Sequence, residues 1–490
     1  MRSSKQTYAR GHRAKSKQQD NRKELEKYYT KVYGTRWPSL QAALLKPTVH
    51  AAVVNAFIPD AAAAACADAG LGPLLSLGPL AARCRAAASG PCPPAPLDAA
   101  SALRAWYWMD LASALPVLLL QPRRGHAVLD MCAAPGGKSV LIAQRLFGPA
   151  ALAPAPSPVA APSATAAASA PAASAASAAV ESGEGEAPAE SGRAAEAGPD
   201  SREGRGPRQA QPLTAATQPL TPLTAPLLPL PPGKLVCNEP DRSRLARLNK
   251  VLEEYAPPTA RANVEVLNHQ GHMYWARNQA ASFDRVLVDA PCSSDRHVLQ
   301  QAATAARGSI AAADWSLDSC RRIADEQLQL CLAAIRALRV GGRLVYSTCS
   351  LAPLQNDELV ERLLRRCGPA AVRVLPPLEI LREEAAALAA ARAGPATMAG
   401  SEAGTGPAGG GKAGGGVEVF GAEATRHGAI CLPDRGGWGP IYVAVVEKVG
   451  EPAAGGAAAL MHLRLDEGSD EEEDEEEDEG GEEGAQQADR

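Results

Sequence analysis

Strand-like and helix-like segments alternate along the chain after residue 126. Short apolar runs predict four strands, at 127–130, 234–238, 283–289 and 343–346. Apolar residues at three- and four-residue spacing predict helices between them, at 138–147, 242–255 and 324–338. Repeated strand–helix units predict a parallel sheet with helices on both faces. A further apolar run at 441–446 is expected to be the final strand.

Two segments interrupt this pattern. Residues 149–232 are mostly Ala, Pro, Ser, Glu and Thr, and residues 384–416 are rich in Ala and Gly. Such compositions bury too little apolar surface to offset the entropy lost on ordering. We therefore expect a folded domain over 126–450 with disordered insertions at 149–232 and 384–416.

The region before residue 126 is predicted to be helical over 20–125. From Asp20 to Trp37, aromatic and aliphatic residues recur at helical spacing. Tyr28, Tyr29 and Tyr33 could stack on nucleic-acid bases, but this spacing favours packing within the helix. Another aromatic run is expected to pack against the following domain, and it consists of Trp106, Tyr107, Trp108 and Met109.

Charge is distributed unevenly. Residues 466–490 hold 15 acidic residues and one basic residue, which leaves 49 basic and 39 acidic residues over 1–465. A modestly cationic body suits a polyanionic partner, although many proteins that never bind nucleic acid share it. The acidic run at 470–479 predicts an extended, solvated tail over 451–490. Competition with RNA for basic residues is the alternative role for that tail.

The first 19 residues contain six basic residues and no acidic residue. They could form an RNA-contacting arm, an organelle-targeting sequence or a solvated tail. No apolar run reaches the roughly 18 residues that a membrane-spanning helix needs, so a soluble protein is expected. The 11 cysteines are odd in number and form no Cys-x-x-Cys pair, which argues against a disulfide framework or a zinc site. We expect a reducing compartment.

A glycine-rich turn follows the strand at 127–130 and has the sequence Asp-Met-Cys-Ala-Ala-Pro-Gly-Gly-Lys, residues 130–138. Its glycines allow backbone N–H groups to approach a ligand, and the following helix N-terminus favours an anion. The turn matches neither the phosphate loop nor the dinucleotide motif. The carboxylate of S-adenosylmethionine is a suitable anion, and Glu239, at the end of the next strand, could accept hydrogen bonds from its ribose.

Two cysteines follow two other predicted strands. Cys292 lies in Asp-Ala-Pro-Cys and Cys349 in Ser-Thr-Cys-Ser. A thiolate that adds to carbon 6 of cytosine makes carbon 5 nucleophilic enough to accept a methyl group, and either cysteine could act in this way. Lys138 could favour the thiolate, and Asp289 could bind the edge of the base. One such cysteine alone is more often a buried apolar residue, but both motifs after a cofactor loop indicate methyl transfer to RNA.

These motifs resemble the signatures of the Nol/Nop/Sun family of RNA cytosine-5 methyltransferases. The similar segments are Cys-Ala-Ala-Pro-Gly-Gly-Lys at 132–138, Asp-Ala-Pro-Cys-Ser at 289–293 and Ser-Thr-Cys-Ser at 347–350. Residues 33–40, 295–297, 354–356 and 438–442 are similar to the mitochondrial branch, which modifies ribosomal or transfer RNA. The resemblance extends over about 20–148, 233–380 and 426–448.

The resemblance implies a Rossmann-like methyltransferase fold with a mainly parallel seven-stranded sheet, S-adenosylmethionine as cofactor and no metal. It implies Cys349 as nucleophile, with Cys292 assisting product release and Asp289 and Lys138 completing the catalytic set. It also implies a set of cofactor contacts, namely Cys132, Ala133, Ala134, Pro135, Gly136, Gly137, Lys138, Glu239, Arg244, Gln270 and Asp289.

Two departures from the family pattern concern the cofactor. Glu239 stands where aspartate is more usual, and Gln270 stands where the family has an aspartate beside adenine, so a charge-assisted contact is lost. The expected partner is RNA, ribosomal or transfer, with an accessible cytosine. The alternative function is that of a ribosome-assembly factor with little catalytic turnover. A ribosome-assembly protein could be a further partner. The mitochondrion is the expected compartment by resemblance, with the nucleus, nucleolus or chloroplast as alternatives.

Overall fold

A computed structural model of the chain describes residues 21–73, 84–87, 92–149, 233–278, 280–304, 315–393 and 421–452. The predicted basic arm, almost all of the 149–232 insertion and nearly all of the acidic tail lie outside these residues. No helix in the described ranges is long and apolar enough to cross a membrane.

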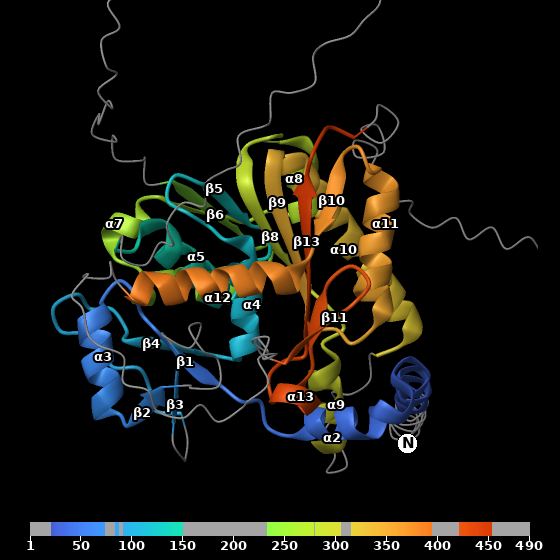
Figure 1. Cartoon of the computed structure of the whole chain (residues 1–490), viewed down its shortest axis with the longest axis horizontal. Helices are drawn as coiled ribbons and strands as arrows, with labels where there is room; N and C mark the ends of the chain where they lie inside the picture. The colour runs from blue at the N-terminus through green and yellow to red at the C-terminus, as the bar shows by residue number, and fades with distance from the viewer. Residues whose placement is uncertain are drawn as a thin grey trace, which may run out of the picture. The chain divides into compact units, whose positions relative to one another are not determined.

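The central sheet has five parallel strands in the order β9-β8-β5-β6-β7 (Figure 1). Their bounds are β5 (Ala127–Asp130), β6 (Lys234–Asn238), β7 (Val264–Leu267), β8 (Phe283–Asp289) and β9 (Leu338–Thr348). The predicted strands at 127–130, 234–238 and 283–289 have these same bounds. The parallel order confirms the predicted α/β class, because each crossover between these strands passes through a helix.

Antiparallel strands extend this sheet beyond β9. β13 pairs with β9, and the three other added strands lie next to β13 or to one another. Their bounds are β10 (Val372–Leu375), β11 (Ala422–Ala424), β12 (Ala429–Cys431) and β13 (Ile441–Lys448). Within the described residues the sheet therefore has nine strands, which corrects the expected seven. Among these added strands, β10, β11 and β12 are three or four residues long, too short to show a hydrophobic period.

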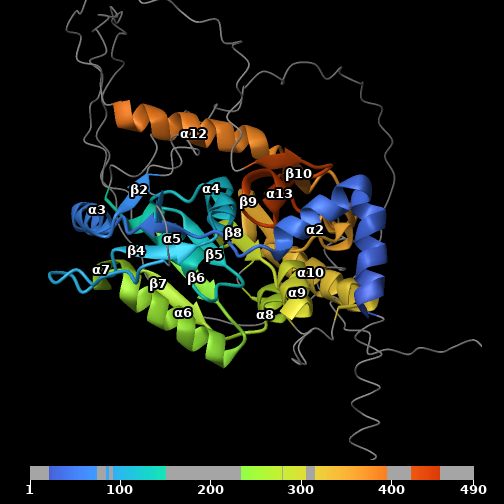
Figure 2. The ribbon, with the colours of Figure 1, turned by 90° about the horizontal axis from the view of Figure 1, so that it is seen from below.

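Helices cover both faces of the sheet (Figure 2). One face packs against α4 (Leu115–Leu120), α5 (Gly137–Phe147) and α12 (Pro377–Ala393), with α6 (Arg242–Tyr255) beside α5. The other face packs against α8 (Gly271–Arg277), α10 (Leu317–Ala337) and α11 (Asp357–Cys367). Shorter elements connect them, at η3 (Leu111–Ala114), α7 (Pro258–Arg261), α9 (Asp295–Thr304), η6 (Pro353–Gln355) and α13 (Pro433–Gly436).

The region over 20–125, which was expected to be helical, combines helices with a small sheet. In its first part, residues 21–33 form a helix that continues through η1 (Gly34–Arg36) into α2 (Trp37–Leu45). Beyond it lies a four-stranded antiparallel sheet in the order β2-β3-β1-β4, flanked by α3 (Pro59–Asp68). The strands are β1 (Ala51–Val54), β2 (Leu71–Pro73), β3 (Cys84–Ala87) and β4 (Trp106–Met109). Pairing of β1 with β4 across 50 residues of sequence decides this structure, and local patterning does not report it.

The N-terminal tyrosines are packing residues. Tyr29 is fully buried, and its ring stacks on Trp37 with the centroids 5.1 Å apart. The Tyr33 hydroxyl donates to the carbonyl oxygen of Leu351, which lies just beyond Cys349. The packing interpretation of these side chains is therefore confirmed for Tyr29, and the N-terminal helix supports the segment that follows β9.

The first ten residues of the predicted 384–416 insertion are helical, and the rest of that segment lies outside the described residues. α12 continues to Ala393, through the first ten residues of the 384–416 segment. Glu384 is buried there, and its carboxylate forms an ion pair with Arg145 on α5 and accepts a hydrogen bond from Gln121. This tertiary contact stabilises helix in an alanine-rich stretch that composition alone marks as disordered.

His126 lies beside the start of β5 and should make the free energy of unfolding depend on pH. Its Nδ1 accepts a hydrogen bond from the Arg123 N–H at 3.2 Å, and burial, with the charge of Arg285, lowers the pKa of His126 to about 4. Because the unfolded imidazole titrates near about 6.5, stability is retained above that pH and lost as the pH falls toward about 4.

His126→Asn keeps an acceptor and removes this titration. The loss of unfolding free energy between about pH 6.5 and 4 should shrink by about 1 to 2 kcal/mol, less than full linkage because the ring is partly exposed. Urea denaturation at several pH values measures it. The prediction would be contradicted if the unfolding free energy changed equally with pH in the variant and in the native chain.

Candidate active site

The loops that carry the predicted site residues meet at one edge of the sheet. They follow the carboxyl ends of β5, β6, β7, β8 and β9. The register places Asp130 beside Leu287 and Asp289 beside Ser347. In open α/β sheets this edge is where ligands bind, so the topology brings the separate sequence motifs into one site.

The turn after β5 has the backbone that its glycines predict. Gly136 adopts a φ of +113°, and a Cβ there would lie 3.0 Å from Val251. A Cβ on Gly137 would lie 2.7 Å from the Tyr107 ring, so neither position accepts a side chain without displacement. α5 begins at Gly137 and directs its free N–H groups toward the turn.

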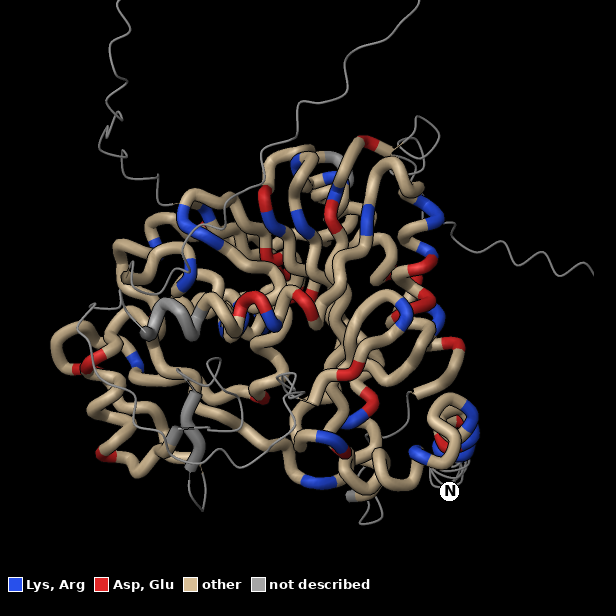
Figure 3. Tube along the Cα trace, viewed as in Figure 1, with Lys and Arg blue, Asp and Glu red and all other residues tan. Residues whose placement is uncertain are grey.

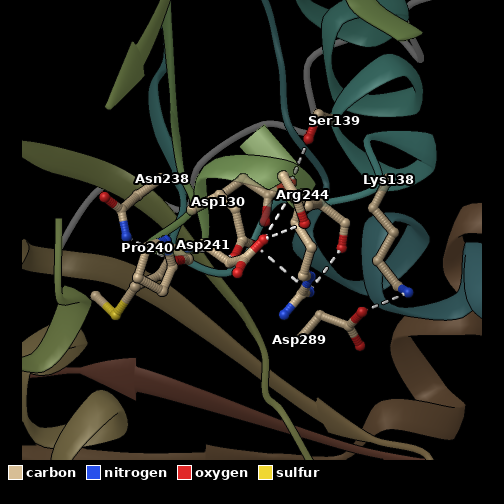
Figure 4. A network of polar contacts seen from close by, with 12 residues as sticks. Asp130, Lys138, Ser139, Asn238, Pro240, Asp241, Arg244 and Asp289 are labelled. Atoms are coloured by element: carbon tan, nitrogen blue, oxygen red, sulfur yellow. Dashed lines mark hydrogen bonds and ion pairs between the residues drawn. The ribbon is translucent and has the colours of Figure 1, made fainter. Parts of the chain in front are cut away.

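Lys138 and Asp289 form an ion pair at the centre of this edge (Figure 4). The Nζ–Oδ2 distance is 2.6 Å, and the other carboxylate oxygen accepts from the Ser347 hydroxyl at 2.7 Å. Burial alone would lower the pKa of Lys138, but the Asp289 carboxylate raises it above the usual value. Lys138 is thus held as a cation by its contact with Asp289.

Glu239 follows β6 and is almost fully buried. Its Oε1 accepts from the Asp241 N–H at 3.1 Å. Its Oε2 lies 3.3 Å from the Arg244 guanidinium, yet has no hydrogen-bond partner among the described residues. Arg244 also donates to the carbonyl oxygen of Ala134 at 3.2 Å. A buried carboxylate with an open acceptor fits a ribose hydroxyl.

Gln270 lies after β7 and is the N-cap residue of α8, with its side chain exposed. Asn238 was not singled out from the sequence, yet it connects this segment to the turn after β5. Its amide donates to the carbonyl oxygens of Met131 and His269, at 3.2 Å and 3.0 Å, and accepts from the His269 N–H. The sequence signal that could have identified Asn238 is its position directly before Glu239.

The two cysteines are in contact, with their Sγ atoms 2.6 Å apart. Cys349 is exposed and Cys292 is partly buried. The hydrogen bond from Cys292 lowers the pKa of Cys349, and the same bond together with burial raises the pKa of Cys292. The Cys349 thiolate is therefore favoured first by Cys292. The charge of Lys138 also acts on Cys349, although its ammonium is paired with Asp289.

A buried polar group supports both cysteine loops and was not anticipated. Asp295 is fully buried, and its Oδ2 accepts from Ser293, from Ser350 and from the Leu351 N–H, at 3.0 Å, 3.0 Å and 2.7 Å. We call Asp295, Ser293 and Ser350 the Asp295 cluster. Sequence patterning could not identify it, because Ser350 comes from a loop 55 or more residues away from Ser293 and Asp295.

A cavity of about 230 Å³ lies between the N-terminal sheet and the turn after β5. Its lining includes His50, Tyr107, Trp108, Cys132, Lys138 and Asp289. Tyr107 and Trp108 belong to β4, so the N-terminal region forms one wall of the site. In the described ranges no group of three or more His, Cys, Asp or Glu side chains could hold a metal ion.

Lys and Arg are interspersed with Asp and Glu over the described chain (Figure 3). Many of the basic side chains are ion-paired, as Arg36 is with Glu423 and Arg104 is with Glu254. Charge distribution alone therefore does not mark a binding path for a polyanion.

Comparison with known proteins agrees with this geometry. A family model described as 16S rRNA methyltransferase RsmB/F matches residues 220–392. The mouse "tRNA (cytosine(34)-C(5))-methyltransferase, mitochondrial" is 26% identical over 70% of this chain and 74% of its own length. The Xenopus tropicalis "5-cytosine rRNA methyltransferase NSUN4" is 29% identical over 52% of this chain, which spans only 42% of that relative.

The solved structure of PH0851 covers 86% of this chain and 65% of its own, with a TM-score of 0.50 and 15% identity. At that identity the likeness supports the fold alone.

Proposed function

Because this chain belongs to the RsmB/F and NSUN family of RNA cytosine-5 methyltransferases, we propose that it transfers a methyl group from S-adenosylmethionine to carbon 5 of a cytosine in RNA. One observation carries the proposal most directly. Two thiols from separate loops are 2.6 Å apart, beside the Lys138–Asp289 ion pair.

Cys349 is the proposed nucleophile because it is the exposed thiol and the one whose pKa is lowered. Its thiolate adds to carbon 6 of cytosine, which makes carbon 5 electron-rich. Asp289, held by Lys138 and Ser347, is the residue proposed to bind the edge of the base as the charge moves. S-adenosylmethionine, when bound, supplies the electrophilic methyl group.

Cys292 is the proposed residue for product release. After methylation, carbon 5 carries a proton that must leave before the bond from Cys349 to carbon 6 can break. Cys292 is in contact with Cys349, so its sulfur lies close to that proton. Cys292 starts as the thiol that donates to Cys349, so it first loses its own proton to solvent once Cys349 is bonded to carbon 6. Its raised pKa makes the resulting thiolate a stronger base for the carbon 5 proton.

The residues present fit the cofactor. We propose that the turn from Cys132 to Lys138 binds its carboxylate at the N-terminus of α5 and that the open Oε2 of Glu239 accepts from its ribose. Arg244 holds the turn through Ala134, and Gln270 is the residue proposed to contact the adenine edge. Asp289 is the remaining proposed cofactor contact, beside the methionine part of S-adenosylmethionine.

The proposed substrate is ribosomal RNA, with transfer RNA as the second candidate, since relatives of both kinds are similar to the chain. The cytosine has to be unpaired or flipped out of its stack for a thiol to reach carbon 6. The mitochondrion is the proposed compartment, because one relative is described as mitochondrial.

Two measurements test the function. The purified chain is incubated with methyl-labelled cofactor and separate pools of ribosomal and transfer RNA, and label in 5-methylcytosine is measured. Bisulfite sequencing of RNA from cells lacking the protein then identifies the target. RNA binding without label, and with no lost methylation site, would support the assembly-factor alternative instead.

Gln270→Asp should strengthen cofactor binding. A carboxylate beside adenine's amino group restores a charge-assisted hydrogen bond worth about 1 kcal/mol, or about fivefold in the dissociation constant. Calorimetric titration with S-adenosylmethionine measures it. Because Asp also caps α8 better than Gln, Gln270→Asn is the matched control: it caps the helix without a charge. Equal affinity of the Asp and Asn variants would place adenine elsewhere.

A further inference from the structure

The contact between the two thiols is a consequence of sheet register. β8 and β9 are parallel neighbours, and Asp289 pairs with Ser347 at their ends. Cys292 is three residues beyond the first and Cys349 is two residues beyond the second. The loops after β8 and β9 are therefore adjacent, and each carries a cysteine at nearly the same distance beyond the end of its strand.

The Asp295 cluster holds these loops together. The serines that follow the two cysteines are in contact, with Ser293 Oγ and Ser350 Oγ 2.8 Å apart. Both hydroxyls also reach the same oxygen of Asp295, which is fully buried. The residue after each cysteine is thus hydrogen-bonded to Asp295. Because this holds the two loops together, the cysteines can approach one another without rearrangement of the loops.

Cys292 and Cys349 differ from most of the other described cysteines in solvent exposure and in pKa. Cys66, Cys237, Cys320, Cys331, Cys367 and Cys431 are buried. Burial raises the pKa of Cys320 and of Cys431 to about 12, which keeps these thiols protonated and unreactive. Cys349 is exposed and has a lowered pKa, and an adjacent second thiol is the arrangement typical of reversible cysteine oxidation.

We propose that Cys292 and Cys349 form a reversible oxidation site for peroxides. The Cys349 thiolate attacks one peroxide oxygen, so that an S–O bond forms, the O–O bond breaks and hydroxide leaves. The sulfur is oxidised to a sulfenic acid while the peroxide is reduced to water. The Cys292 thiol then attacks this sulfur, an S–S bond replaces the S–O bond, and the departing hydroxide takes the thiol proton as water.

This modification goes beyond methyl transfer, and its regulatory consequence rests on the proposed function. In the disulfide neither sulfur can add to a base or accept a proton, so methylation stops. Attack by an external thiol restores both groups. Capture of the sulfenic acid by Cys292 also protects Cys349 from irreversible oxidation.

Mass spectrometry of the full chain tests the site independently of activity. The chain is treated with hydrogen peroxide without RNA, free thiols are alkylated, and a non-reducing digest is analysed. The expected product is a Cys292–Cys349 linked peptide, about 2 Da lighter than the two reduced peptides together, which disappears after dithiothreitol. Linkage of Cys349 to another cysteine, or no linkage while both thiols are consumed, would overturn the proposal.

Two variants sharpen the result. In Cys292→Ser, Cys349 should proceed to the sulfinic acid, a gain of about 32 Da that dithiothreitol does not reverse. Cys92→Ser removes an exposed thiol outside the site and should leave the linked peptide unchanged. Reversible oxidation of Cys349 without Cys292 would show that the pairing has no protective role.

A methyl-transfer assay on the same samples separates the two proposals. Activity should fall in proportion to the linked peptide and return with dithiothreitol. If the disulfide forms but neither the reduced nor the oxidised chain transfers methyl groups, the proposed function fails and the oxidation site stands. If a fully linked sample remains active, inactivation by oxidation is wrong.

Discussion

Replacement of Cys349 by alanine is expected to abolish methyl transfer. Without a sulfur to add to carbon 6, carbon 5 stays a poor nucleophile, and removal of a covalent nucleophile commonly costs on the order of 10⁴-fold or more in rate. Single-turnover transfer of labelled methyl groups into RNA measures the loss. Cofactor affinity should remain nearly unchanged, because Cys349 does not line the cavity beside the β5 turn.

Cys349→Ser is the matched variant for this experiment. It keeps the size of the side chain and a polar atom, but its hydroxyl is a much weaker nucleophile than a thiolate. Both variants should therefore be inactive while they fold and bind cofactor normally. Substantial transfer by Cys349→Ala would show that the other thiol, or no thiol, initiates the reaction.

The second large effect is expected from Cys292→Ala. This variant can still form the bond between Cys349 and cytosine, but it lacks the group proposed to remove the carbon 5 proton. The methylated base should remain attached, so a covalent protein–RNA complex accumulates. The measurement is a slowly migrating band on denaturing gels that disappears after nuclease digestion.

The double variant Cys292→Ala, Cys349→Ala provides the control, because it should form no such band. Cys92→Ala should behave like the native chain, since Cys92 belongs to neither loop. An adduct that appears with Cys349→Ala alone would reverse the roles of the two cysteines. Thermal unfolding of each variant shows whether a missing band reflects chemistry or loss of the fold.

The N-terminal region is part of the site rather than an appendage. β4 places Tyr107 against Gly137, and its neighbour Trp108 lines the cavity beside Lys138. The N-terminal helix reaches the segment after Cys349 through Tyr33. A cofactor turn and two cysteine loops on a bare α/β sheet would lack this wall.

Local sequence was sufficient where an element contains an apolar run and its motif is contiguous. The runs at 127–130, 234–238 and 283–289 are strands with those bounds because each has an apolar centre and ends in a polar turn. The helix at 242–255 also has its predicted bounds, with Asp241 accepting from the Arg244 N–H as its cap. The motif residues then follow, since they occupy the ends of these strands.

Other short strands could not be anticipated in the same way. β2 and β11 exist because a partner strand satisfies their backbone groups, and nothing in so short a stretch distinguishes them from a loop. α12 likewise extends into an alanine-rich stretch because Glu384 is anchored to Arg145. In each case a distant residue decides the local structure.

By itself, then, the sequence determined the parallel α/β core, the order of its motifs and the chemical class that two thiols and a glycine-rich turn indicate. Only the tertiary structure decided that the thiols are in contact, that Asp295 joins their loops and that Lys138 is paired with Asp289. The physical reason is that backbone preference and hydrophobic period act over a few residues. Hydrogen bonds and pKa shifts at the site depend on groups that only folding brings within a few ångströms.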